Sequence, residues 1–192
     1  MKLIVISPET EDPREHTVLA ELFAAGLTSY HLRKPTWSRE QLADWLLVLP
    51  SEFHSRVVLH SHHDLAAQFN IGGIHNAQAV YPSAPLRSQA VHSVVELRGL
   101  LEARARLVFS PVFPSFSKLG YGPAFDRDEL CMLLALPRRA EVIALGGIDA
   151  TRIQACRELG FDGIAVLGAV WQSPDPVRAF VELQTALHAH AA

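Results

Sequence analysis

The sequence predicts a single (β/α)8 (TIM) barrel domain over residues 1–192. Three observations favour this fold: short β-like runs alternate with longer helical runs, the alternation yields eight β-like runs, and no low-complexity segment interrupts it. Alternating strands and helices are typical of a parallel sheet, and eight repeats favour a closed barrel over an open doubly wound sheet. With 49% hydrophobic and 19% charged residues, the chain can bury one substantial core.

The β-like runs are short and mostly apolar. In chain order they cover 2–7, 28–33, 56–60, 73–75, 89–91, 106–110, 141–145 and 163–167. The chain is shorter than the roughly 250 residues typical of such barrels, so most connections must be short. The exception is 111–125, which is rich in Pro, Ser, Gly and aromatic residues and is expected to form a long functional loop.

Start and stop signals delimit the helical runs. Pro13 lies in the first turn of a run that Gly26 ends, and Ser38 with Gln41 forms a capping-box pattern. Asp149 is expected to cap a late helix. The helical runs expected are, in order, 12–25, 38–49, 64–69, 93–103, 127–136, 149–159 and 175–190.

Charge and hydropathy exclude several classes of protein. The net charge is −3 with histidine neutral, so no broad basic field is available for nucleic acid or an anionic membrane surface. No run of about 18 apolar residues is present, so no membrane span is expected and the cytoplasm is the expected compartment. Cys131 and Cys156 lie in apolar helical patterns and are expected to be buried free thiols. The sequence leaves monomer and homodimer both open.

Barrels of this kind place their sites at the carboxyl ends of the strands. The residues expected there are His31, Arg33, Lys34, His60, Ser61, His75, Asn76, His92, Ser115, Ser117, Lys118, Gly146, Gly147 and Gly168. The strongest local signal is the pair of glycine turns after the last two strands, Gly146-Gly147 and Gly168. Many barrels bind phosphate at these turns through backbone N–H groups, which glycine lets an anion approach closely. We expect a phosphate site there; the alternative is that the glycines only permit tight turns.

Cations and hydroxyls elsewhere could complete an anion site. Ser115, Ser117 and Lys118 supply two hydroxyls and one cation within four residues, which suits a phosphate or a polarised heterocycle. Arg33 can bind a phosphate through its guanidinium fork. The alternatives are a solvated polar loop for 115–118 and a surface salt bridge for Arg33.

The ten histidines invite two interpretations. Residues 60 and 62 of His60-Ser61-His62-His63 would share one face if the strand continued that far. No nearby Cys or Glu completes a familiar ligand set, so no metal site is predicted. His92 directly follows a strand at the expected site face, where a neutral imidazole can move a proton near pH 7. A hydrogen-bonded structural histidine is the alternative for His92.

Six segments, taken in order, carry a resemblance to a known family. They are 30–34, 73–75, 91–93, 110–118, 144–148 and 163–166. Together they resemble the thiamin-phosphate synthase/TenI family over nearly the whole chain, and Pro-Val-Phe-Pro-Ser-Phe-Ser-Lys at 111–118 is the most specific piece. The resemblance implies a barrel that binds thiazole phosphate. The synthase joins this thiazole to an aminopyrimidine methyl pyrophosphate with Mg²⁺ assistance, whereas a TenI-branch tautomerase moves a proton to aromatise a thiazole carboxylate phosphate.

The resemblance also implies roles for individual residues. Ser115 and Ser117 would contact the thiazole, and the phosphate would be held by Gly146, Gly147, Leu167 and Gly168. His31, Arg33 and Lys118 would face the pyrimidine and pyrophosphate. Lys34 and His60 are further binding candidates because of their places at the strand ends. His92 stands where the tautomerase has a histidine implicated in proton transfer, so His92 and Lys118 are the catalytic candidates.

The sequence departs from the synthase at the residues that bind Mg²⁺. The family's Asn-Asp pair after the third strand reads His60-Ser61, and its second Asp position reads Val80. The Lys of its Gln-x-Arg-x-Lys segment reads Pro35. Because Mg²⁺ needs hard oxygen ligands, no metal or other cofactor is predicted.

Three functions stay open at this point. The favoured one is TenI-type proton transfer on a small phosphorylated thiazole by His92. The second is a thiamin-phosphate synthase that also binds the aminopyrimidine pyrophosphate, with a pyrophosphate site rebuilt from His60, Arg33 and Lys34. The third is a non-catalytic binding or regulatory protein that kept the pocket.

Overall fold

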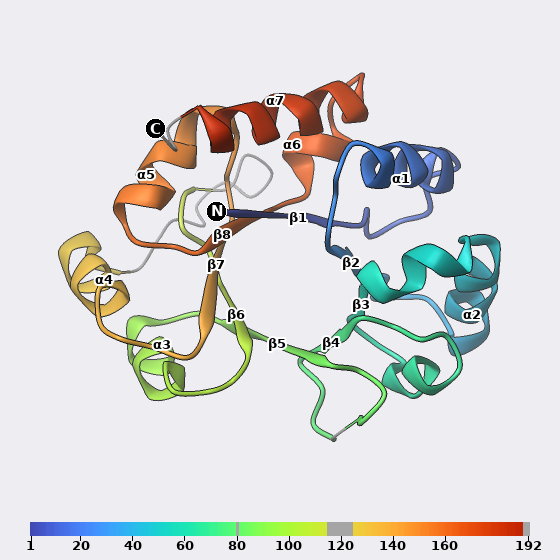
Figure 1. Ribbon diagram of the computed structural model, residues 1–192, viewed down its shortest axis with the longest axis horizontal. Helices are drawn as coiled ribbons and strands as arrows, with labels where there is room; N and C mark the ends of the chain where they lie inside the picture. Colours follow the sequence, from blue (N-terminus) through green and yellow to red (C-terminus); the bar gives the residue numbers. More distant parts are fainter. Residues whose placement is uncertain (80, 115–124, 190–192) are drawn as a thin grey trace.

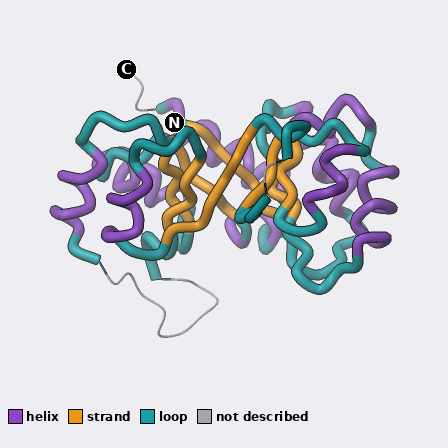
Figure 2. Tube along the Cα trace, turned by 90° about the horizontal axis from the view of Figure 1, so that it is seen from below, coloured by secondary structure: helices purple, strands orange, loops and turns teal. Residues whose placement is uncertain are grey.

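The computed structural model describes residues 1–79, 81–114 and 125–189 and confirms the predicted (β/α)8 barrel. Eight parallel strands pair in chain order, and the barrel closes between β8 and β1. Figure 1 shows the strands around the centre and the helices outside them. In the perpendicular view the strands cross in the middle of the molecule with helices on either side (Figure 2).

The strands are β1 (Lys2–Ile6), β2 (Tyr30–Leu32), β3 (Val57–Leu59), β4 (Gly73–His75), β5 (Leu86–Val91), β6 (Arg106–Phe109), β7 (Glu141–Leu145) and β8 (Gly163–Val166). The α-helices are α1 (Glu15–Ala24), α2 (Arg39–Val48), α3 (Val94–Leu100), α4 (Arg127–Leu134), α5 (Ile153–Glu158), α6 (Gly168–Trp171) and α7 (Pro176–His188). The short 3₁₀ helices in the described part of the chain are η1 (Ser51–Arg56), η2 (His63–Ala67) and η3 (Ala150–Arg152). Within the described ranges, every helix is too short or too polar to cross a membrane.

The differences from the predicted elements have local causes. β5 starts at Leu86, earlier than the run expected over 89–91, because Gly73 of β4 pairs with Leu86. The helix expected over 149–159 starts as η3 and becomes α-helical only at Ile153. Cys156 is buried as expected, but the expectation is wrong for Cys131, which is exposed. Its neighbour Leu130 occupies the buried face of α4 instead.

Side-chain alternation along the strands separates two apolar clusters. In β1, Leu3 and Val5 join the large cluster beneath the helices, whereas Ile4 and Ile6 join a small one with Val108, Ile143 and Ala165. Successive side chains of a strand point to opposite faces, so the small cluster fills the barrel interior. Ile6 pairs with His31 in register, which places a histidine at the next inward position. Inward-pointing side chains near the carboxyl ends of the strands can therefore be polar.

Candidate functional site

Two adjoining cavities open at the carboxyl ends of the strands. The first, of about 470 Å³, is lined by His31, Arg33, His60, His75 and His92 among others, and is called the histidine cavity. The second, of about 310 Å³, is lined by the turns after β7 and β8, with Gly146, Gly147, Leu167 and Gly168, and is called the glycine corner. Glu9, Leu145, Ala165 and Leu167 line both. The two cavities therefore form one continuous site.

The backbone conformation and the close neighbours of residues 146 and 147 require glycine at both positions. Gly146 and Gly147 have φ angles of +103° and +61°, a region that other residues rarely adopt. The segment after β6 runs alongside: Phe113 N–H donates to the Gly146 carbonyl at 3.2 Å, and a Cβ on Gly147 would lie 2.4 Å from the Pro114 carbonyl oxygen. The guanidinium of Arg152 also donates to the Gly147 carbonyl. The tight-turn alternative thus accounts for these two glycines without any anion.

Gly168 is a different case. Its φ lies outside the left-handed region, and the atoms nearest to a Cβ there belong to the side chain of Gln172, at 3.2 Å. The indole N–H of Trp171 donates to the Ile6 carbonyl at 2.8 Å and fixes α6 across the end of β1. Backbone strain does not demand glycine at 168. The missing side chain instead leaves the backbone accessible from the glycine corner.

His92 lies directly after β5 and lines the histidine cavity. Its Nδ1 lies 3.0 Å from the carbonyl oxygen of Ser110, and its backbone N–H donates to Glu96 Oε2 at 2.9 Å. A carbonyl oxygen can only accept, so this contact assigns the proton of the neutral ring to Nδ1, and the Ser110 hydroxyl, 3.4 Å from Nδ1, is the longer contact. The Nε2 of neutral His92 therefore holds a lone pair, as a proton acceptor requires.

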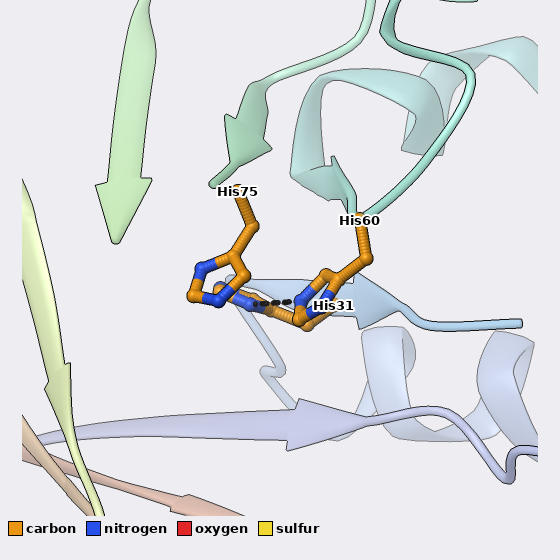
Figure 3. A group of neighbouring side chains, drawn as sticks. All are labelled: His31, His60 and His75. Atoms are coloured by element: carbon orange, nitrogen blue, oxygen red, sulfur yellow. Dashed lines mark hydrogen bonds between the residues drawn. The ribbon is translucent and has the colours of Figure 1, made fainter. Parts of the chain in front are cut away.

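Three further histidines meet at the ends of β2, β3 and β4 (Figure 3). Nδ1 of His31 lies 3.0 Å from Nε2 of His60, and the rings of His60 and His75 stack with centroids 4.1 Å apart. Val58 pairs with Gly73 in register, so the residues two positions on, His60 and His75, come level on neighbouring strands and point inward. We call these three side chains the histidine cluster.

Burial keeps the histidine cluster neutral. It lowers the pKa of His31 well below its usual value, and nearby His75 lowers it further. Burial likewise lowers the pKa of His60, and it lowers the pKa of His75 to about 4. Nε2 of His31 is buried without a hydrogen-bond partner in the described part of the chain. Such an atom costs about 1–3 kcal/mol, so hydrogen bonding alone does not explain the cluster.

Carboxylates are scarce in the histidine cavity. Of the described residues that line it, Glu9 alone is acidic, and it forms an ion pair with Arg33. The ends of β2, β3 and β4 present imidazole nitrogens instead. Mg²⁺ prefers hard oxygen ligands, so this donor set does not fit Mg²⁺.

Lys34 does not reach the cavity. Its Nζ lies 2.6 Å from Glu15 Oε2 and donates to the Thr10 carbonyl at 2.9 Å, with the side chain fully buried. Tyr30 also donates to Glu15, at 2.6 Å. Adjacent residues of an extended segment point to opposite sides, so Lys34 turns away when Arg33 faces the cavity. This correction places Lys34 in the packing of α1 against the barrel instead of among ligand-binding groups.

The structure thus brings most of the predicted site residues together. His31, Arg33, His60, His92, Gly146, Gly147, Leu167 and Gly168 line the two cavities. The hydroxyls and cation expected from Ser115, Ser117 and Lys118 lie outside the described residues.

The third strand ends at Leu59, so the condition under which residues 60 and 62 would share a face is not met. The backbone turns left-handed at His62, whose Nε2 donates to the Trp37 carbonyl at 3.0 Å. His63 similarly donates to the His75 carbonyl. The side chain that stacks on His60 is that of His75, which the spacing of residues 60–63 does not indicate. Its sequence signal is a histidine at the last position of a short strand.

Comparison with known proteins agrees with this fold. Residues 3–170 match the family described as Thiamine monophosphate synthase. The thiamine-phosphate synthase of Geobacillus thermodenitrificans is 27% identical over 203 aligned positions, which cover 96% of this chain and 90% of that protein. That of Desulfitobacterium hafniense (strain Y51) is 31% identical over 170 positions, or 80% of each. The crystal structure of thiamine phosphate pyrophosphorylase from Bacteroides thetaiotaomicron matches over the full length of both chains, with a TM-score of 0.83 and 28% identity.

Proposed function

This chain belongs to the thiamine monophosphate synthase (TMP-TENI) family, and from that premise we propose that it binds a thiazole phosphate and moves a proton on its ring. The single observation that carries the proposal is the position of His92. Its Nδ1 proton is held by the Ser110 carbonyl, and its ring lines a cavity continuous with the glycine corner. The chemistry is that of the TenI-type tautomerase that the sequence resembles.

The glycine corner is proposed to take the phosphate and the histidine cavity to take the ring. Backbone N–H groups at glycine turns bind an oxyanion without a compensating cation nearby. Ser115, Ser117 and Lys118 are proposed to cover the polar side of the bound ligand. The thiazole then lies within reach of His92, whose Nε2 accepts a proton from one ring atom and returns it to another. The Ser110 carbonyl stabilises the imidazolium that forms in between.

A synthase activity is the second candidate, supported by the names of the relatives. It needs positive charge against a leaving pyrophosphate. Three side chains were candidates to supply that charge. Burial lowers the pKa of His60, so its ring is neutral, and Lys34 is paired with Glu15. Arg33 is paired with Glu9. The geometry therefore favours proton transfer.

The experiment supplies wild-type protein with the non-aromatic thiazole carboxylate phosphate and, separately, with both synthase substrates, with and without Mg²⁺. We expect aromatisation that does not require Mg²⁺ and no thiamin phosphate. Formation of thiamin phosphate without aromatisation would establish the second candidate. Binding of thiazole phosphate without either reaction would establish the third, non-catalytic function.

The Gly168→Asp variant is expected to bind thiazole phosphate about 10- to 100-fold more weakly than wild type. Two like charges about 4 Å apart repel by about 1 kcal/mol in water and about 4 kcal/mol at a protein surface. Gly168→Asn adds a side chain of the same shape without the charge and should retain most of the affinity, since Gln172 can move aside. Calorimetric titration measures both. Equal affinities in wild type and Gly168→Asp would place the phosphate elsewhere.

A further inference from the structure

The proposed proton transfer uses His92 and leaves the histidine cluster without a task. His31, His60 and His75 are nonetheless three polar rings buried or half-buried at the end of the barrel. Only one proton can lie between His31 Nδ1 and His60 Nε2, which are 3.0 Å apart. The other nitrogen of His31 is buried without a partner among the described residues. In either tautomer, the buried imidazole of His31 therefore makes a single hydrogen bond.

The geometry of the cluster suits a small cation. Zn–N bonds of about 2.0–2.1 Å at tetrahedral angles set ligand nitrogens about 3.4 Å apart. The three rings each offer one nitrogen, and these atoms all lie within 4.8 Å of one another. The stacked rings of His60 and His75 would have to rotate for their lone pairs to point at one ion. The ligands come from three neighbouring strands, whose register fixes their relative positions.

One of the three rings, that of His75, also has an outer-shell partner. Nδ1 of His75 lies 2.9 Å from Ser88 Oγ on β5. This hydrogen bond orients the ring and leaves Nε2 of His75 as the nitrogen that can bind an ion. Metal-ligating histidines almost always have their other ring nitrogen held in this way.

We propose that His31, His60 and His75 bind a divalent transition-metal ion such as Zn²⁺, with one coordination position open to the histidine cavity. Neutral imidazole suits Zn²⁺ and its neighbours in the periodic table, whereas Mg²⁺ selects oxygen. Three protein ligands with an open fourth position are typical of zinc sites that bind water or a substrate oxygen. Arg33 lines the same cavity but pairs with Glu9, which reduces its repulsion of a bound cation. An ion here would bind an oxygen atom of a phosphorylated or carboxylated ligand in the cavity.

The experiment titrates untagged, chelator-treated protein with Zn²⁺ by calorimetry and with Co²⁺ by visible absorption. We expect about one ion per chain with a Kd of about 1 µM or lower, and d–d bands of a four- or five-coordinate Co²⁺. His75→Ala and His60→Ala should each weaken binding by roughly 100-fold or more, because each removes one of the three imidazole ligands. Ser88→Ala keeps all three ligands and should weaken binding by about 10- to 100-fold. His188→Ala, on the exposed last turn of α7, is the matched control and should bind as wild type.

The outcomes separate this inference from the proposed function. No stoichiometric Zn²⁺ or Co²⁺ in folded wild-type protein overturns it, as does unchanged binding in His75→Ala and His60→Ala. An equal loss in His188→Ala would assign the binding to surface histidines and overturn it as well. Circular dichroism checks that each variant is folded. Thiazole phosphate affinity is measured on the metal-free protein, so a failure of metal binding leaves the phosphate proposal standing, and the reverse also holds.

Discussion

Replacement of His92 by alanine is expected to slow thiazole aromatisation by about 10²- to 10⁴-fold, the usual contribution of one acid–base group. The ring contributes a proton-accepting Nε2, while the phosphate is expected to bind in the glycine corner, which His92 does not line. The affinity for thiazole phosphate should therefore stay close to that of wild type. Single-turnover rates followed by absorption, together with calorimetric affinities, measure the two effects separately.

Three comparisons distinguish an acid–base role for His92 from a structural one. His92→Gln keeps a polar side chain that cannot exchange protons near neutral pH and should be as slow as His92→Ala. Added imidazole should restore part of the rate of His92→Ala, because a free base can enter the space left by the ring. His188→Ala should react as wild type. A His92→Ala protein with the wild-type rate would remove His92 from the reaction.

Replacement of Lys34 by methionine is expected to lower the free energy of unfolding by about 3–5 kcal/mol. For a domain of this size the midpoint of thermal unfolding should fall by about 6–20 °C. Methionine fills a similar volume, so the loss comes from Glu15, whose carboxylate would stay buried without its cation. Burial raises the pKa of Glu15, and the hydrogen bonds from Lys34 and Tyr30 to its carboxylate oppose this rise. Thermal and urea unfolding measure the change.

The double variant Lys34→Met/Glu15→Gln supplies the control. It removes both charges and keeps an acceptor for the Tyr30 hydroxyl, so it should recover much of the lost stability. Its affinity for thiazole phosphate should equal that of wild type, because Lys34 lies outside the cavity. A stable Lys34→Met protein with weakened ligand binding would contradict this placement and return Lys34 to the binding site.

The elements of the barrel follow largely from local sequence. The capping box expected at Ser38 is formed, with Gln41 N–H donating to the Ser38 hydroxyl at 3.3 Å and Ser38 N–H donating to Gln41 Oε1 at 2.8 Å. Asp175 caps α7 more simply, with its side chain accepting from Arg178 N–H. Such signals depend on neighbours three residues away, and so they can be recognised without the fold.

The sequence predicted the site residues only where their position at the end of a strand determines their place in the barrel. His31, His60, His92 and the glycine turns follow from the rule that barrels use the carboxyl ends of their strands. The pairing of His60 with His75 depends on the register between β3 and β4, and the sequence does not show that register. In the sequence, Lys34 and Arg33 are both cations at the end of the second strand. Only the buried ion pair of Lys34 with Glu15 shows that Lys34 has a different role.

The glycine turns show a second limit of sequence reasoning. A Gly-Gly pair after the seventh strand indicates a phosphate site and a tight turn equally well. The positive φ angles, with the approach of Pro111 to Gly146 and of Pro114 to Gly147, already require glycine at both positions. The phosphate proposal therefore depends most on Gly168, where no backbone contact demands glycine.

The most direct measurement is a pair of calorimetric titrations of wild-type protein, one with the thiazole phosphate and one with the same thiazole as its free alcohol. If the glycine corner recognises the phosphate through its amide N–H groups, the phosphate should bind at least about 100-fold more tightly than the alcohol, which corresponds to about 2.8 kcal/mol. Equal affinities for the two compounds would contradict an anion site at the ends of β7 and β8, and with it the proposed function.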